Sequence, residues 1–285
     1  MRTTLGDLRK KRAAGRKISM LTCYEAAYAQ VMDAAGVDAL LVGDSLGMVV
    51  QGRDSTLPVT VQDIAYHMAN LARGSRQAFL LADMPFGSYQ EGPAQALRNA
   101  VVLMQAGAQM VKLEGGQELA ETVGLLVRSG IPVCGHIGLM PSHVNALGGF
   151  RVQGKGEEEA RRIVEDAQAL EAAGAALVVI EAVPDPVARQ VCQAAPALMT
   201  IGIGASAACD GQVLVVHDML GLNDKPAKFV KDFLAEVEAG PGAIRRAFEA
   251  YAQEVASGAF PAADHVYGLS GEALSTLYGS AKASR

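Results

Sequence analysis

The sequence predicts a single-domain α/β barrel in which eight parallel strands are surrounded by helices. Eight short apolar runs alternate along the chain with amphipathic stretches rich in Ala, Glu and Arg. Because these runs are almost continuously hydrophobic, both faces of each strand should be covered, which is typical of a parallel sheet. Eight such units in 285 residues match the size and strand count of a (β/α)8, or TIM, barrel. An open, doubly wound sheet is the alternative.

The order of the expected elements follows from these runs. The strands are expected at residues 17–22, 38–43, 78–83, 108–114, 131–136, 176–181, 198–204 and 212–218. In the helices between them, Thr60 is an expected N-cap and Gly74 an expected left-handed C-cap. A helix should precede the first strand, and a helical extension from about residue 224 should pack on the barrel. No linker divides residues 1–285, so one domain is expected.

Composition argues against several classes of protein. The net charge is -5 with both signs spread along the chain, which does not favour nucleic acid or a charged membrane surface. No signal-peptide pattern opens the chain, and no apolar run reaches the ~18 residues that span a bilayer. The four Cys form no C-x-x-C pair, which is typical of reduced thiols in the cytosol. We therefore expect a soluble, cytoplasmic protein.

Polar residues gather at the carboxyl ends of six of the eight runs. In an α/β barrel the loops at this end of the strands build the active site. These polar residues are Asp44 and Ser45, Asp83, Lys112 and Glu114, His136, Glu181, and His217 with Asp218. Because six strand ends would meet at one rim, they predict a catalytic or ligand-binding site there.

Three of these residues, Asp44, Asp83 and Glu114, are carboxylates from three neighbouring strands. Left without counter-charge they would repel one another, and a divalent cation removes that repulsion. An all-oxygen ligand set suits Mg²⁺, whereas Zn²⁺ is less favoured because only His136 and His217 could join. For each acid alone, a helix cap or a loop salt bridge is the alternative.

Lys112 lies two residues before Glu114, so the two side chains should share one face of a strand. Lys112 can pair with Glu114 or Asp83, can neutralise a bound anion such as a substrate carboxylate, or can do both at once. The hydroxyl of Ser45 and the backbone N–H groups of its turn could hold the same carboxylate. A purely structural turn residue is the alternative for Ser45.

Glu181 ends an apolar run, and a partly desolvated carboxylate suits a general base near neutral pH. Its alternative is a salt bridge to Arg151 or Arg189. His136 is an alternative base or a hydrogen-bond donor to substrate. Cys134 on the same strand face allows a Cys/His acid–base pair, which is less favoured because a Cys within a strand is usually inert packing.

The segment "GIGASA" at residues 202–207 matches a dinucleotide-binding fingerprint. That fingerprint requires a helix to begin at the glycines, whereas here another apolar, strand-like run follows at once. The segment is therefore interpreted as a glycine-rich barrel loop.

Several longer motifs resemble the ketopantoate hydroxymethyltransferase (3-methyl-2-oxobutanoate hydroxymethyltransferase) family over nearly the whole chain. They are "VGDSLGMVVQGRDSTLPVT" (42–60), "KLEGG" (112–116), "HIGL" (136–139), "VIEAVP" (179–184) and "CDGQVLVVHDMLG" (209–221). The resemblance implies a barrel that binds Mg²⁺ and an α-keto acid. It also implies transfer of a hydroxymethyl group from 5,10-methylenetetrahydrofolate to 3-methyl-2-oxobutanoate, giving 2-dehydropantoate for pantothenate and coenzyme A.

The resemblance also implies roles for individual residues. It places one Mg²⁺ per subunit on Asp44, Asp83 and Glu114. It gives the keto acid contacts to Asp44, Ser45, Asp83 and Lys112, makes Glu181 the proton acceptor, and implies a homo-oligomer, commonly a decamer. The alternatives are a related Mg²⁺-dependent barrel lyase or mutase acting on an α-keto acid, or a non-catalytic barrel that binds a keto acid.

The chain departs from the family pattern at two places. The usual "HIGLTPQ" reads "HIGLMPSH", with Met140, Ser142 and His143, and the usual "GIGAG" ends in Ser206. These positions are expected to lie outside the metal shell and to alter loop details and folate contacts.

Overall fold

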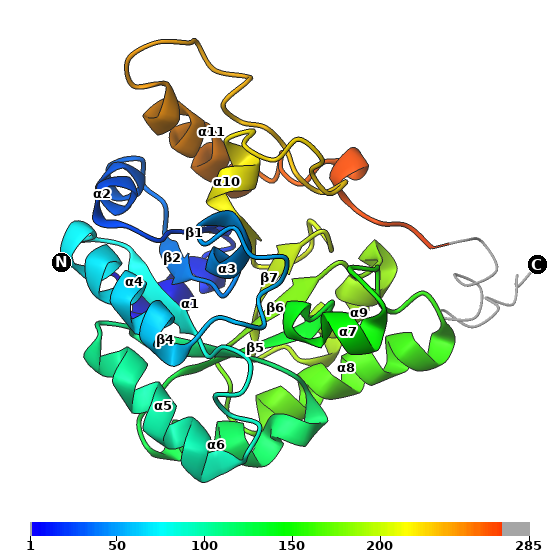
Figure 1. Ribbon diagram of the computed structural model, residues 1–285. Helices are drawn as coiled ribbons and strands as arrows, with labels where there is room; N and C mark the ends of the chain where they lie inside the picture. Colours follow the sequence, from blue (N-terminus) through cyan, green and yellow to red (C-terminus); the bar gives the residue numbers. More distant parts are fainter. Residues whose placement is uncertain (1, 270–285) are drawn as a thin grey trace, which may run out of the picture.

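The computed structural model describes residues 2–269 and confirms the predicted (β/α)8 barrel (Figure 1). Eight parallel strands pair in chain order, and the open-sheet alternative is wrong because β8 pairs with β1 and closes the barrel. The strands are β1 (Ile18–Thr22), β2 (Ala39–Val42), β3 (Phe79–Asp83), β4 (Met110–Glu114), β5 (Val133–Gly138), β6 (Leu177–Glu181), β7 (Met199–Ile203) and β8 (Gly211–Leu214).

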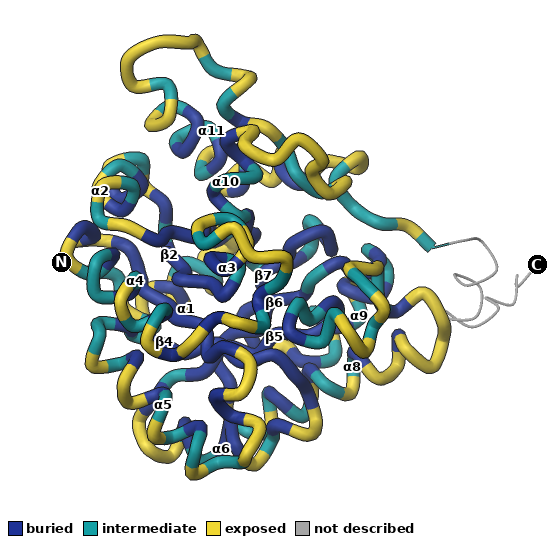
Figure 2. Tube along the Cα trace, in the orientation of Figure 1, coloured by how far each residue is buried: buried dark blue, intermediate teal, exposed yellow. Residues whose placement is uncertain are grey.

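Helices surround the strands, and the exposed residues lie on the outward faces of the helices and in the loops, whereas the strands are buried almost throughout (Figure 2). They are α1 (Leu5–Ala13), α2 (Ala26–Ala34), α3 (Leu46–Val49), α4 (Val61–Gly74), α5 (Pro93–Gln105), α6 (Ala120–Arg128), α7 (Val144–Leu147), α8 (Glu157–Ala172), α9 (Asp185–Ala194), α10 (Val216–Met219) and α11 (Ala243–Ser257). Short 3-10 turns occur at Gln117–Leu119, Pro141–His143 and Ala263–His265.

The hydrophobic core has two layers because successive side chains of a strand point to opposite faces. In β4, Val111 and Leu113 point outward and pack in the layer between the strands and the helices. Met110 points inward and packs inside the barrel with residues such as Phe79 and Leu177. The same inward face of β4 then carries Lys112 and Glu114, so its chemistry changes from apolar to charged along the strand.

The predicted N-terminal helix, α1, covers the amino ends of the strands. Leu8 is only 1% exposed and packs within the barrel interior. Lys11 lies 2.5 Å from Asp38, and a second ion pair joins Arg12 to Asp210 at 3.0 Å. These contacts seal the amino end of the barrel with an apolar plug held by ion pairs at its rim.

Two local expectations are wrong. Gly74 is the last residue of α4 and not a left-handed cap; a Cβ there would lie 2.3 Å from the Ala26 carbonyl oxygen, so glycine allows α4 to approach the start of α2. The last strand ends at Leu214, not at residue 218. There the N–H of Val216 donates to Thr22 Oγ1 at 3.0 Å, so the backbone leaves the sheet and forms α10. The Thr60 cap is confirmed, with a reciprocal capping box to Asp63.

The predicted C-terminal extension packs on the barrel through α11. The Tyr251 hydroxyl lies 2.9 Å from both the Met20 and the Gln212 carbonyl oxygens, where β1 meets β8. Phe233 and Phe260 pack against the Tyr251 ring. The part of the extension from residue 270 onward lies outside the described residues. Within residues 2–269, no helix is both long and apolar enough to cross a membrane.

The α1 plug generates a prediction about stability. Leu8→Ala should lower the free energy of unfolding by about 2–5 kcal/mol, because it leaves a cavity at the closed end of the barrel. The exposed neighbour Arg9 provides the control, and Arg9→Ala should change the value by less than about 0.5 kcal/mol. Urea unfolding followed by circular dichroism measures both. Equal midpoints for Leu8→Ala and the unsubstituted protein would show that α1 is not part of the core.

Candidate active site

One cavity of about 410 Å³ opens at the carboxyl ends of the strands. Every predicted site residue lines it, namely Asp44, Ser45, Asp83, Lys112, Glu114, His136 and Glu181. Asp218, predicted as part of the last strand end, also lines the cavity from α10, whereas its neighbour His217 is not among the lining residues. The structure therefore brings together side chains from at least five consecutive barrel segments.

Strand register decides which of these side chains become neighbours. Across β3 and β4, Asp83 is paired with Lys112, and across β4 and β5, Glu114 is paired with His136. All four occupy the inward face near the open end of the barrel. Parallel pairing therefore sets opposite charges side by side on adjacent strands.

Lys112 forms its ion pair with Asp83, and this decides between the two ion-pair partners that the sequence left open. Its Nζ lies 2.7 Å from Asp83 Oδ1, and the two side chains are 6% and 5% exposed. Burial lowers the pKa of Lys112, but the neighbouring Asp83, Glu114 and Asp44 raise it well above its usual value. Lys112 is therefore a permanent buried cation among carboxylates.

Asp44 and Asp83 carry more negative charge than Lys112 balances. Burial raises the pKa of Asp44 well above its usual value, and the charges of Glu114 and Asp83 add to the rise. Burial also raises the pKa of Asp83, although Lys112 and a 2.9 Å hydrogen bond from the Asp44 N–H oppose the rise. The two aspartates thus lie in a site that would be stabilised by another positive charge.

Glu114 is held by a loop residue that the sequence did not assign to the site. The backbone N–H of Ser142 donates to Glu114 Oε2 at 2.9 Å, and the Ser142 hydroxyl donates to the same oxygen. Burial raises the pKa of Glu114, but hydrogen bonding to His136 and its charge, with Lys112 and Ser142, lower it to about 2.

Position 142, which is expected to lie outside the metal shell, therefore lies next to the predicted shell and not in a remote part of the loop. Ser142 directly contacts a predicted metal ligand, because the Pro141–His143 turn returns the loop after β5 to the end of β4. Ser206, the other departure, donates to Asp185 Oδ1 at 2.6 Å and does not line the cavity.

His136 bridges two carboxylates. Its Nε2 lies 3.1 Å from Glu181 Oε2, and its Nδ1 lies 3.4 Å from Glu114 Oε1. Burial and Lys112 lower the pKa of His136, but Glu114 and Glu181 raise it to about 9. The two carboxylates therefore favour the protonated ring, whose Nδ1 also lies 3.2 Å from Lys112 Nζ.

Glu181 is the most accessible of the three carboxylates on β3 to β6, the other two being Asp83 and Glu114. Its side chain is 15% exposed. Its ion-pair partner is His136, and the alternative partner Arg189 instead lies 2.8 Å from Asp185. Glu181 is therefore the partly exposed member of this pair, in the position expected of a group that exchanges a proton with a ligand.

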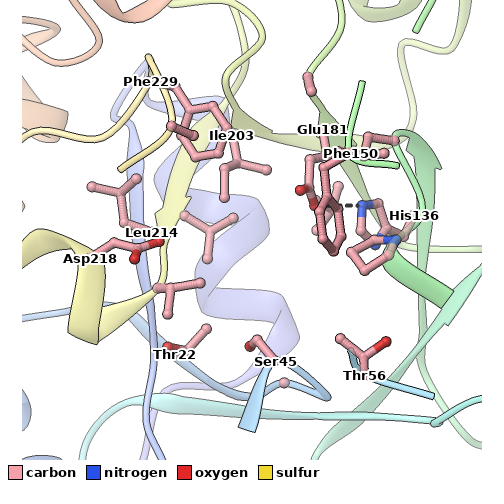
Figure 3. A pocket seen from close by; sticks show the side chains of 18 of the residues that line it. Thr22, Ser45, Thr56, His136, Phe150, Glu181, Ile203, Leu214, Asp218 and Phe229 are labelled. Carbon is pink, nitrogen blue, oxygen red and sulfur yellow. Dashed lines mark ion pairs between the residues drawn. The ribbon is translucent and has the colours of Figure 1, made fainter. Parts of the chain in front are cut away.

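Ser45 points its hydroxyl toward the cavity floor, 2.8 Å from the Tyr24 hydroxyl, and makes no side-chain cap bond to α3 (Figure 3). The backbone N–H groups expected to be free in this turn are largely used. The N–H of Asp44 donates to Asp83, and those of Leu46 and Gly47 donate to carbonyls within the turn. The N–H groups of Asp44, Leu46 and Gly47 are therefore not available to an anion, and an anion contact from Ser45 stays a prediction.

Two alternative chemistries find no support in this cavity. Cys134 lies deeper in the barrel interior, donates its S–H to the Gly135 carbonyl at 3.3 Å, and has its pKa raised to about 12 by burial. It does not line the cavity. The loop after β7 leads directly to β8, so no helix begins at the "GIGASA" glycines and the dinucleotide reading stays excluded.

The residues that could hold a metal do not form a closed cage. Within residues 2–269, no group of three His, Cys, Asp or Glu side chains converges closely enough to bind an ion by itself. Any cation here would therefore complete its coordination with water or substrate oxygens, as Mg²⁺ commonly does.

A charged cavity at the carboxyl end of an eight-stranded parallel barrel defines an α/β-barrel enzyme. Solved structures with this fold include a 2,3-dimethylmalate lyase of the PEP mutase/isocitrate lyase superfamily, with a TM-score of 0.56 and 18% identity, covering 94% of this chain and all of that one. A phosphonopyruvate hydrolase in complex with oxalate and Mg²⁺ is also similar, with a TM-score of 0.54 and 14% identity over 70% of this chain and 72% of that one. At these identities the likeness concerns the fold.

Sequence comparison identifies the family. The family model for ketopantoate hydroxymethyltransferase matches residues 2–263. A 3-methyl-2-oxobutanoate hydroxymethyltransferase of Azoarcus sp. strain BH72 is 57% identical over 265 residues, 93% of this chain and 96% of that relative. The enzyme of the same name from Chromobacterium violaceum is 54% identical over 268 residues, 94% of this chain and all of that relative. The chain therefore belongs to the ketopantoate hydroxymethyltransferase family and is a transferase, which excludes the non-catalytic alternative.

The buried charge of Lys112 generates a second prediction. In metal-free buffer, Lys112→Met should lower the free energy of unfolding by about 3–5 kcal/mol at neutral pH, because Asp83 is left buried without its partner. The matched control Lys10→Met removes an amine that is 82% exposed and should change stability by less than about 1 kcal/mol.

The pH dependence of this loss follows from the aspartates. Because the pKa values of Asp44 and Asp83 are raised, the folded state binds these protons more tightly than the unfolded state. The free energy of unfolding that Lys112→Met loses should therefore be partly regained as the pH falls from about 8 to about 5. Chemical unfolding at both pH values measures this, and a loss that grew on acidification would contradict the assigned charges.

Proposed function

We propose that this protein transfers a hydroxymethyl group from 5,10-methylenetetrahydrofolate to 3-methyl-2-oxobutanoate, forming 2-dehydropantoate. The observation that carries the proposal is the juxtaposition in one cavity of the Lys112 ammonium, the aspartate pair beside it, and the Glu181 carboxylate. Such a site can hold an acidic substrate at one end and remove a proton at the other. The relatives named above carry the name of this activity.

The donor set fits Mg²⁺. Asp44, Asp83 and Glu114 supply hard oxygen ligands, and the buried Glu114 Oε1 faces the His136 ring at 3.4 Å while Oε2 accepts from Ser142. The raised pKa of Asp44 reflects burial and the negative charge of its neighbours, which a divalent cation would offset. Asp44 and Asp83 would hold the ion directly, and Glu114 directly or through water. When bound, Mg²⁺ would supply Lewis-acid polarisation of the keto group.

The remaining residues hold the substrate and move its proton. The Lys112 ammonium and the Ser45 hydroxyl bind the substrate carboxylate, where charge-assisted hydrogen bonds fix its orientation. Glu181 accepts the proton from C3 of the keto acid. His136, whose two ring nitrogens face Glu114 and Glu181, fixes the direction of the Glu181 carboxylate. The C3 carbanion then forms a carbon–carbon bond to the one-carbon unit of the folate in an aldol-type step. Hydrolysis of the donor by one water breaks its carbon–nitrogen bonds, supplies the hydroxyl oxygen of the product and releases tetrahydrofolate.

A cytoplasmic location and a homo-oligomeric, decameric assembly remain predictions that follow from composition and from the family resemblance.

Proton removal can be measured without the folate. In D₂O with Mg²⁺, the protein should exchange the C3 proton of 3-methyl-2-oxobutanoate, and Glu181→Gln should slow this exchange by about 10²–10⁴-fold. The exposed Glu157 provides the control, since Glu157→Gln removes the same charge far from the cavity. NMR measures the exchange, and a coupled assay for 2-dehydropantoate measures the full reaction. Absence of product on supplying methylenetetrahydrofolate would overturn the proposed function.

Metal binding predicts a gain in stability. Mg²⁺ at about 100 times its dissociation constant should raise the free energy of unfolding by about 2.7 kcal/mol, because it binds the folded state only. Asp44→Asn should abolish this gain, whereas Asp224→Asn, in the exposed loop after α10, should keep it. Thermal unfolding with Mg²⁺ or with EDTA provides the measurement. The same Mg²⁺-dependent shift in Asp44→Asn and in the unsubstituted protein would place the metal elsewhere.

A further inference from the structure

We infer that Asp218 and the apolar wall beside it, formed by Ile203, Leu214 and Phe229, bind the pteridine ring of the folate co-substrate. The Asp218 carboxylate would accept hydrogen bonds from the ring. This inference rests on the proposed function and assigns the half of the cavity that the keto acid leaves unused. A five-carbon keto acid beside Lys112 and Glu181 fills only part of a cavity of about 410 Å³, which lies within the size range of sites for larger ligands.

The cavity has two chemically different sides. Glu181 and His136 lie on one side, and Asp218 lies across the open space from them with Leu214, Ile203 and Phe229 nearby (Figure 3). The first side is charged and buried. The second side is apolar except for Asp218 and the polar residues of the loop that follows α10, so it suits a flat ring with a polar edge.

The apolar wall depends on a glycine that the sequence singled out. Gly204, in the "GIGASA" loop, has φ +59, and a Cβ added there would lie 2.4 Å from Cδ1 of the Phe229 ring. Glycine therefore allows the Phe229 ring to lie directly against the loop after β7, next to Ile203 on the cavity wall. The GIGASA loop therefore shapes the apolar wall of the cavity, and it does not bind a dinucleotide.

Asp218 offers the polar edge of that wall. Asn223 Nδ2 donates to Asp218 Oδ1 at 3.1 Å and so fixes the carboxylate, which Figure 3 shows directed into the cavity. The second oxygen is then available to a ligand. A pteridine ring of the folate type presents an amide N–H and an adjacent 2-amino group on one edge, and a carboxylate accepts two such parallel donors.

The other carboxylates that line the cavity within the described chain are already engaged. Asp83 pairs with Lys112, and Glu114 accepts from Ser142. Glu181 pairs with His136, and Asp44 lies within the proposed cation site. Asp218 is the carboxylate that the proton-removal machinery does not use, and it lies where the carbon donor must face C3 of the keto acid across the cavity.

The test uses tetrahydrofolate binding to the full chain, which does not depend on turnover. Asp218→Asn keeps an oxygen that can accept from Asn223 but removes the negative charge and one acceptor. If the role of Asp218 were purely structural, the variant would therefore bind tetrahydrofolate with unchanged affinity. We expect the dissociation constant for tetrahydrofolate, measured by calorimetry, to rise about 10–100-fold. KM for methylenetetrahydrofolate should rise in parallel, and C3 proton exchange without folate should not fall with it. The control Asp224→Asn should change none of these.

A ligand-side measurement identifies the contact. A tetrahydrofolate analogue lacking the 2-amino group should bind the unsubstituted protein at least tenfold more weakly and show no further loss in Asp218→Asn, because both changes remove the same hydrogen bond. If the unsubstituted protein exchanges the proton and binds tetrahydrofolate, but Asp218→Asn binds it equally well, this inference alone fails. If the unsubstituted protein neither exchanges the proton nor binds tetrahydrofolate, the proposed function fails and the inference fails with it.

Discussion

The ion pair between Lys112 and Asp83 is the interaction on which the active end of the barrel depends. Removing an ammonium and several carboxylates from water costs several kcal/mol per ion, and only close opposite charges compensate that cost. Lys112 lies 2.7 Å from Asp83, and His136 bridges Glu114 and Glu181. These contacts form one connected network of charges, in which each group influences the protonation of its neighbours. Asp44 has no cation of its own in this network, so a further positive charge would stabilise it.

The barrel makes this network possible because each strand serves two purposes. The inward face of β4 begins with Met110 in the apolar interior and ends with Lys112 and Glu114 at the cavity. The amino end of the barrel is sealed by α1, so the charged end is the one that opens to ligands. The apolar interior thus supports the placement of the charged groups above it. Asp83, Lys112, Glu114, His136 and Glu181 project from strands, whereas Asp44 and Ser45 lie in the turn after β2.

Much of this arrangement could be predicted from sequence because a strand has a period of two and a barrel gathers the carboxyl ends of its strands. That reasoning correctly placed Lys112 and Glu114 on one face. It could not choose Asp83 over Glu114 as the partner of Lys112, because pairing depends on the register between strands. It missed Ser142, which reaches Glu114 through a loop that returns over the barrel. It also extended the last strand through Asp218, because α10 is only one turn long and begins at Val216, which continues the apolar run of β8.

The central claim is that the charged end of the cavity holds a cation and a keto acid together. A crystal structure with Mg²⁺ and 3-methyl-2-oxobutanoate tests this most directly. The account predicts an ion in contact with the Asp44 and Asp83 carboxylates, and the acid carboxylate within hydrogen-bonding distance of Lys112 and Ser45. Glu181 should face C3, and the side of the cavity lined by Phe229 and Asp218 should remain open. An acid bound away from Lys112, or an ion bound outside the aspartate pair, would contradict the account.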